Sequence, residues 1–364
     1  MSLDSATLAD LAGQIRLWGK ELGFAELRIG DVDLSHIEGS FQAWLDAGYH
    51  GEMTYMASHG TKRTRPAELV PGTVRVISAR MNYLPKTESW RVEEQGQAAD
   101  KAVISLYARG RDYHKVLRTR LQQLAERIEK AIGPFGYRVF TDSAPVMEVA
   151  LAAKAGLGWR GKHSLLLSRE AGSMFFLGEI LIDIPLPVDE PVGQHCGQCS
   201  ACMDVCPTKA IVAPYTVDAR LCVSYLTIEL HGSIPVELRP LIGNRVYGCD
   251  DCQLVCPWNK FAQAAAVDDF SVRNGLDNAR MVHLFAWTEE QFLRMLEGSP
   301  IRRIGHERWL RNIAVGLGNA AVSMRGDAEI VAALQARLGH SSEMVREHVV
   351  WALGRHGVET RSDG

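Results

Sequence analysis

All eight cysteines of this 364-residue chain fall in one segment, from Cys196 to Cys256. Thiolates are strong ligands for iron and zinc, and cysteines also form disulfides. Structural disulfides are usually spread through small secreted domains, whereas this chain places one thiol-rich segment inside a large scaffold without cysteine. The distribution therefore predicts metal binding in a reducing compartment.

The cysteines have a regular spacing. Residues Cys196 to Pro207 follow C-x2-C-x2-C-x3-C-P, and residues Cys249 to Pro257 follow the last three cysteine positions of that pattern. In bacterial ferredoxins with this pattern, three thiolates surround one [4Fe–4S] cubane and the fourth ligates the other. Cys222 is then free to supply the missing ligand. The sequence predicts two [4Fe–4S] clusters, one held by Cys196, Cys199, Cys202 and Cys256, the other by Cys222, Cys249, Cys252 and Cys206.

Two structural zinc sites are the alternative, because eight thiolates can also hold zinc. Zinc sites usually pair two short cysteine hooks across a longer loop, whereas three closely spaced thiolates and a distal Cys-Pro fit the corners of a cubane. Cubanes exchange single electrons, so two of them predict an electron relay to a reaction site elsewhere in the chain.

The composition describes an ordinary globular protein, with 46% apolar residues, 23% charged residues and a formal net charge of −3. The length allows two or three domains with their own cores. The net charge gives no global signature of a nucleic-acid binder, so such a partner would need a local basic patch.

The chain has no predicted export or membrane segment. Its first residues form an amphipathic helical pattern with Leu8, Leu11 and Ile15 on one face, which is unlike a signal peptide. The most apolar stretch, 175–186, carries two acids and is shorter than the roughly 18 to 20 apolar residues of a membrane span. We expect a cytoplasmic protein.

Three regions are predicted to position the chemistry. Residues 1–190 read as an α/β region, with strands near 74–79, 103–107 and 138–141. Its helix at 114–132 has a clear 3.6-residue apolar period, and another helix is expected after 142–145, ending near Gly156. Residues 191–262 form the ferredoxin-like module. Residues 263–364 read as helices, in which 310–318 and 345–354 echo one another as in HEAT-like repeats.

Several short motifs around the cysteines make the chain resemble the epoxyqueuosine reductases, and more distantly the corrinoid reductive dehalogenases. The resemblance covers nearly the whole chain. The residues that carry it, besides the two cysteine runs, are Lys62-Arg63, Pro66, Leu69-Val70-Pro71-Gly72, Asp112-Tyr113-His114, Thr141-Asp142-Ser143, Ala155-Gly156-Leu157-Gly158-Trp159, Ile242-Gly243-Asn244-Arg245 and Arg311-Asn312.

The resemblance implies a reaction and its cofactors. The expected reaction reduces epoxyqueuosine to queuosine at the wobble position of tRNA with a GUN anticodon, consuming two electrons and two protons. The expected cofactors are the two clusters and a base-off cobalamin between the α/β region and the cluster module. The chain has no D-x-H-x-x-G motif, which agrees with a corrinoid that lacks a protein histidine below cobalt. Flavodoxin or ferredoxin is the expected electron donor, and a monomer the expected state.

Asp142 is the catalytic residue that the resemblance implies, as the proton donor to the departing oxygen. An epoxide oxygen leaves more easily once it is protonated, so the chemistry needs such an acid. Burial beside a corrinoid could raise the pKa of this carboxyl. The alternative is a helix cap, because Asp142-Ser143 precedes an expected helix.

The resemblance also places residues around the corrinoid. Arg63 would hold a propionamide or phosphate oxygen, although Arg65 is close enough to compete for this role. Core packing explains the presence of the apolar residues at these positions equally well. His195 is interpreted as an ordinary histidine rather than a ligand. The expected corrinoid contacts are Arg63, Ser105, Asp142, Leu166, Leu177, Val223, Cys249 and Asp250.

A local basic patch lies in the C-terminal third, where residues 302–311 hold four arginines and a histidine against one acid. It could meet phosphates, or it could be a solvated helix face. Glu289 would repel phosphate and could contribute only through a base or ribose. The resemblance places these residues near the anticodon arm: Thr288, Glu289, Arg303, Gly305 and His306.

Two other functions remain open on the sequence alone. A corrinoid reductase of small molecules would not need the arginine-rich tail, and it usually has an exported precursor. A ferredoxin-type electron-transfer protein would hold clusters without a corrinoid.

Overall fold

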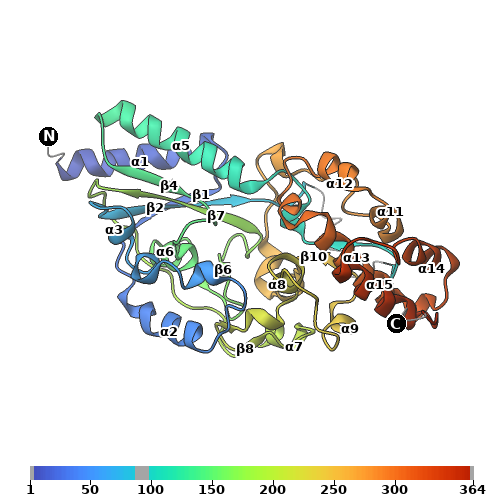
Figure 1. Cartoon of the computed structure of the whole chain (residues 1–364). Helices are drawn as coiled ribbons and strands as arrows, with labels where there is room; N and C mark the ends of the chain where they lie inside the picture. The colour runs from blue at the N-terminus through green and yellow to red at the C-terminus, as the bar shows by residue number, and fades with distance from the viewer. Residues whose placement is uncertain (1–3, 87–97, 361–364) are drawn as a thin grey trace.

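The computed structural model describes residues 4–86 and 98–360 and combines a β-sheet with many helices (Figure 1). The sheet has the order β1-β2-β7-β4, and each neighbouring pair is antiparallel. Predicted strands at 74–79 and 138–141 are two of these four. The strands of the sheet are β1 (Glu26–Gly30), β2 (Arg75–Asn82), β7 (Phe175–Ile182) and β4 (Tyr137–Phe140).

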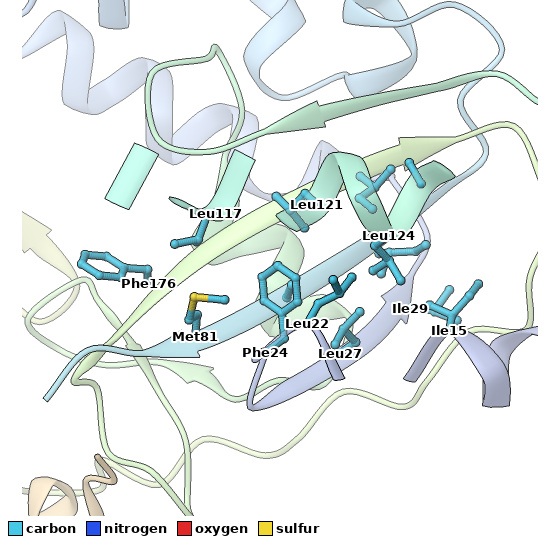
Figure 2. Close-up of a cluster of buried hydrophobic side chains, with 14 of the residues drawn as sticks. Ile15, Leu22, Phe24, Leu27, Ile29, Met81, Leu117, Leu121, Leu124 and Phe176 are labelled. Atoms are coloured by element: carbon cyan, nitrogen blue, oxygen red, sulfur yellow. The ribbon is translucent and has the colours of Figure 1, made fainter. Parts of the chain in front are cut away.

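Helices α1 (Ser5–Glu21) and α5 (Tyr113–Ile132) lie together on one face of this sheet (Figure 1). The apolar side chains of α5 face the strands, as their 3.6-residue period predicts. Figure 2 shows Leu117, Leu121 and Leu124 above the sheet beside Phe24 and Met81. This core fixes α5, whose first turn carries residues of the candidate site.

Helix α6 (Glu148–Lys154) covers part of the other face and contacts β1, β2 and β7. It begins later than the sequence pattern suggests. Asp142 has a positive φ of 54°, and the N-cap is Met147, so the Asp142–Met147 segment is a loop. The interpretation of Asp142 as a helix cap is therefore wrong.

A short parallel pair joins the sheet domain to the cysteine segment. Strand β3 (Val103–Ile104) pairs with β10 (Arg245–Tyr247). The predicted strand at 103–107 stops at Ile104, because Asp250 accepts the backbone N–H of Leu106 at 2.7 Å and a 3-10 turn, η3 (Leu106–Ala108), begins there.

The cysteine segment contains short elements, which is typical of a fold organised by ligand loops. Its elements are α7 (Ala201–Val205), β8 (Ile211–Ala213), β9 (Thr216–Val217), η4 (Ala219–Leu221), α8 (Val223–Ile228), α9 (Arg239–Ile242), α10 (Asp251–Leu254) and η5 (Pro257–Phe261). The remaining short elements before it are α2 (Ser35–Asp46), η1 (Thr54–Met56), η2 (Gly60–Arg63), α3 (Pro66–Leu69), β5 (Trp159–Arg160) and β6 (Leu166–Leu167).

The C-terminal third is helical, and its long helices α13 and α15 pack side by side. A Cβ on Gly318 would lie 2.9 Å from the Cα of Ala352, so a glycine permits this close approach. The elements of this part are η6 (Asp268–Phe270), α11 (Met281–Phe285), α12 (Glu289–Met295), η7 (Pro300–Ile304), α13 (Gly305–Met324), α14 (Ala328–Gln335) and α15 (Glu343–Arg355).

One arginine of the predicted basic patch lies inside the protein. Arg311 is fully buried and donates to the carbonyl oxygens of Leu226, Leu230 and Gly232. Its guanidinium holds the turn after α8 against α13 and cannot meet a phosphate. The basic patch is therefore smaller than its sequence suggests.

Hydrophobic clusters cross the predicted domain boundaries. Ala102 and Ile104 pack with the C-terminal helices, while Ala265 and Phe270 pack with the sheet domain. In the two ranges that the structure covers, no helix has the length and apolar character needed to span a membrane.

Candidate functional site

Asp142 lies on the loop that follows β4, beside the first turn of α5. Its carboxylate accepts hydrogen bonds from the hydroxyl of Tyr113 and from Nε2 of His114, the latter at 3.1 Å. The Tyr113 ring stacks on Phe176, with ring centroids 4.3 Å apart, so its hydroxyl is firmly placed. The Asp142 side chain is 54% exposed. It is an acid that is held in position yet open to a substrate.

The pKa of Asp142 differs from the expectation. Burial by itself would raise it, but the hydrogen bonds from His114 and Tyr113 outweigh burial and lower the pKa below its usual value. The carboxyl is therefore ionised at neutral pH, and the raised pKa expected beside a bound corrinoid stays a prediction. The protons nearest to this carboxylate are those on the Tyr113 hydroxyl and on Nε2 of His114.

Tyr55 marks the place where several distant segments meet. Burial first, and then the charges of Glu229 and Asp142, raise its pKa to about 12, while Arg303 and Arg63 act in the opposite direction. These four charged groups come from four parts of the chain. Because all of them act on one phenol, the fold gathers them around a common site.

Arg63 and Arg65 have different surroundings. Arg63 is buried at 5% exposure and donates to the carbonyl oxygen of Tyr55, while its Nε has no hydrogen-bond partner in the described part of the chain. Arg65 is exposed and paired with Glu38 and Glu68. Arg63 is thus the guanidinium with a donor left for a bound group.

The other predicted corrinoid contacts form three groups. Ser105 donates to one carboxylate oxygen of Asp250 at 2.5 Å, and the second oxygen accepts the N–H of Leu106. Because of these hydrogen bonds, the side chains of Ser105 and Asp250 have a structural role. The apolar contacts divide between two hydrophobic clusters, Leu166 with Leu177 near α6 and Val223 with Cys249 near α8.

The cysteines form two groups that differ from their order in sequence. The thiol pKa of Cys256 is raised by burial and then by Cys196, Cys202 and Cys199. Burial and then Cys206 raise the pKa of Cys222. Burial and then Cys222 raise that of Cys252 most, and Cys202 and Cys206 add smaller contributions. Cys256 therefore lies with the first run, and Cys206 with the second group.

The first cysteine group surrounds a cavity. Its volume is about 370 Å³, and its lining includes Cys196, Cys199, Cys202 and Cys256. His195 also lines it, bonded to Arg169 at 3.0 Å and packed on Trp159, as an ordinary histidine would be. No three His, Cys, Asp or Glu side chains within 4–86 and 98–360 converge closely enough to hold a single metal ion.

Three of the five predicted tRNA contacts line a second cavity of about 420 Å³: Glu289, Gly305 and His306. His306 contacts the carbonyl oxygen of Trp287 through Nε2 at 2.8 Å. Thr288 caps α12 in a reciprocal bond pair with Gln291. Arg303 lies apart from this lining and pairs with Glu229.

Sequence reasoning missed two acids behind Asp142. Glu148 accepts the backbone N–H of Asp142 at 2.6 Å, and Glu179 lies next to Glu148 in the centre of the sheet. The one signal was Glu179 itself, a charged residue inside the apolar run of β7. Sequence reasoning used this acid only to argue against a membrane span.

Two family models match segments of this chain. Residues 63–143 match the family model described as epoxyqueuosine reductase QueG, DUF1730. Residues 195–259 match the 4Fe-4S double cluster binding domain, which confirms the predicted double-cluster module.

Full-length relatives extend the match. An epoxyqueuosine reductase of Burkholderia pseudomallei is 64% identical over 96% of this chain and 93% of its own length. That of Escherichia coli is 57% identical over 98% and 92%.

Solved structures also match. An epoxyqueuosine reductase with an epoxyqueuosine-modified tRNA-Tyr stem loop superposes with a TM-score of 0.86 and 25% identity, covering 96% of this chain and 90% of that one. A Bacillus subtilis epoxyqueuosine reductase whose catalytic loop is swung out of the active site superposes with a TM-score of 0.82 and 25% identity, over 95% and 90%. The chain belongs to the epoxyqueuosine reductase family.

Proposed function

We propose that this protein reduces epoxyqueuosine to queuosine at the wobble position of tRNA, with Asp142 passing a proton to the departing oxygen. The observation that carries this proposal is the Asp142 carboxylate, exposed to a substrate and bonded to two proton donors. Family membership supports the substrate. Removal of the epoxide oxygen as water requires two electrons and two protons, so the site must supply protons as well as accept electrons.

The residues fit the cofactors that this reaction needs. Two cysteine groups and the cavity beside the first would hold two [4Fe–4S] clusters, and the spare donor of buried Arg63 would hold a polar edge of base-off cobalamin. When bound, these groups supply low-potential electrons at the substrate. Ser105, Leu166, Leu177, Val223, Cys249 and Asp250 are proposed to line the corrinoid site.

His114 is the proton source next to Asp142. Burial by itself would lower the pKa of this imidazole, yet hydrogen bonds to Asp112 and Asp142 raise it to about 9. The ring is therefore protonated at neutral pH and touches the Asp142 carboxylate. A proton can move from His114 to Asp142 and on to the oxygen as negative charge develops there. The Asp142 loop is proposed to move when tRNA enters and leaves.

The first prediction concerns Asp142. Asp142→Asn keeps the shape of the side chain but cannot carry the proton, so conversion of epoxyqueuosine in an anticodon stem-loop should fall by about 10²- to 10⁴-fold. Conversion is measured anaerobically by nucleoside mass spectrometry, with cobalamin and a strong reductant supplied.

Exposed Asp46→Asn serves as the control and should keep wild-type activity. If wild-type protein with full iron and bound corrinoid converts nothing, the tRNA substrate is wrong, and a small-molecule corrinoid reductase becomes the better proposal. If the wild-type protein holds clusters but binds no corrinoid, an electron-transfer protein becomes the better proposal.

The second prediction concerns pH and His114. A folded pKa of about 9, against an ordinary value of 6.5, means that this group stabilises the fold fully below 6.5 and loses its contribution as pH rises through 9. Asp112→Asn should reduce this loss. The melting temperatures of both proteins between pH 6 and 10 measure it, and identical curves would contradict the assignment.

The third prediction tests the crossed cysteine groups. Cys202→Ser with Cys256→Ser removes ligands of one cluster and should leave about half of the iron. Cys202→Ser with Cys206→Ser removes a ligand of each cluster and should lower the iron content much further. Iron analysis and EPR of the reduced proteins measure this. The opposite ranking, with more iron left in Cys202→Ser with Cys206→Ser, would show that the clusters follow the sequence order.

The second cavity is proposed to receive the anticodon arm through Glu289, Gly305 and His306, while Thr288 and Arg303 are proposed to contact the arm outside the cavity. His306→Ala should raise the KM for the stem-loop about fivefold to tenfold with little change in kcat, since His306 lies outside the reacting groups. His36→Ala, an exposed histidine on α2, is the matched control. An unchanged KM in His306→Ala would remove this residue from the interface.

Several further features remain proposals. The protein is proposed to act as a monomer in the cytoplasm and to take electrons from a flavodoxin or ferredoxin. The proposed layout is a corrinoid-binding domain at 1–190, a ferredoxin-like domain at 191–262 and a tRNA-contacting domain of HEAT-like repeats at 263–364. The packing of α13 on α15 supports the repeats.

A further inference from the structure

Glu179 is an acid in an unusual place. It lies in β7, the strand flanked by β2 and β4, and its exposure is 0%. In the part of the chain that the structure describes, neither of its carboxyl oxygens receives a hydrogen bond from a donor. A buried carboxylate without a donor is costly, so an ionised Glu179 is not a stable arrangement.

The polar group next to Glu179 is another carboxyl, that of Glu148, within hydrogen-bonding reach. Two ionised carboxylates in contact repel, and neither can donate. A proton between them removes one charge and turns the repulsion into a hydrogen bond, as in other carboxyl pairs. The geometry therefore requires a proton on this pair.

Glu148 also faces the catalytic loop. Its Oε1 accepts the backbone N–H of Asp142 at 2.6 Å. Asp142 has a φ of 54°, a left-handed conformation that is strained for residues other than glycine. An interaction must offset this strain, and the bond to Glu148 acts on the strained residue itself.

We propose that Glu148 and Glu179 share a proton and that this pair holds the Asp142 loop in its working conformation, making both acids positioning residues. The inference relies on the proposed function only for the role of Asp142. Through this buried pair, the interior of the sheet controls whether the Asp142 carboxylate faces the substrate.

The titration of the pair agrees with the geometry. Burial first, and then the charge of Asp142, raises the pKa of Glu148 to about 7, and burial and then Glu148 raise that of Glu179 well above its usual value. The other ionisable groups that face the pair are Asp142, His114 and Tyr113. The last proton therefore leaves at a pH well above the usual range of a carboxyl, where two adjacent negative charges would push the acids apart and release the loop.

Two variants separate the steps of this inference. Glu179→Gln provides a permanent N–H donor to Glu148 that cannot titrate. Glu148→Ala removes the acceptor of the Asp142 N–H. Exposed Glu126→Gln on α5 is the matched control. Hydrogen exchange of residues 141–147 reports loop closure without any substrate, and the pH profile of kcat reports its effect on the reaction.

In the wild type, loop protection and kcat should fall together as pH rises from 7 to 10. Glu179→Gln should keep the loop protected at high pH, whereas its kcat should still fall as His114 loses its proton near pH 9. Glu148→Ala should lose protection at every pH, with kcat lowered about tenfold or more and KM within about twofold. The proposal is overturned if the loop protection of Glu179→Gln follows the wild-type pH curve, or if Glu148→Ala keeps the loop protected. Absence of epoxyqueuosine turnover would instead refute the proposed function, because hydrogen exchange still tests the loop.

Discussion

The buried carboxylate of Asp250 connects the two halves of the chemistry. It follows Cys249 directly and accepts hydrogen bonds from the Ser105 hydroxyl and the Leu106 N–H, so a proposed cluster ligand and the sheet domain share one rigid junction. Next to it, the N–H of Ser105 donates to the carbonyl oxygen of Tyr247 at 2.9 Å and extends the β3–β10 pair. This junction therefore holds the start of the second cysteine run in a fixed position relative to the sheet domain.

The reaction site is organised by a balance of charges. Asp112, His114 and Asp142 form an acid–base–acid series in which the central imidazole takes the proton and both carboxylates are ionised. Burial opposes this arrangement, and the short hydrogen bonds outweigh it. Asp142 is thus charged at rest and bonded to a protonated neighbour. The proposed proton transfer to the leaving oxygen relies on this arrangement.

The C-terminal helices contribute side-chain hydrogen-bond donors as well as surface charge. Arg311 and Asn312 on α13 bond the carbonyl oxygens around α8 and β10, which connect the helical part to the cysteine segment. Arg303, two turns earlier, extends toward Glu229 and influences Asp142 and Tyr55. Within this short arginine-rich stretch, Arg311 therefore stabilises the fold, whereas Arg303 faces the candidate site.

The sequence by itself determined the chemistry that local spacing encodes. The cysteine pattern predicted two clusters, and the apolar period of α5 predicted its helix and its buried face, because ligand loops and helices depend on nearby residues. Short motifs identified the family and pointed to Asp142. Only the tertiary structure decided the protonation of Asp142, since its pKa depends on His114 and Tyr113, which are 28 and 29 residues away. The burial of Arg311, the choice between Arg63 and Arg65, and the pairing of Glu148 with Glu179 likewise depend on contacts between distant segments, which no local pattern contains.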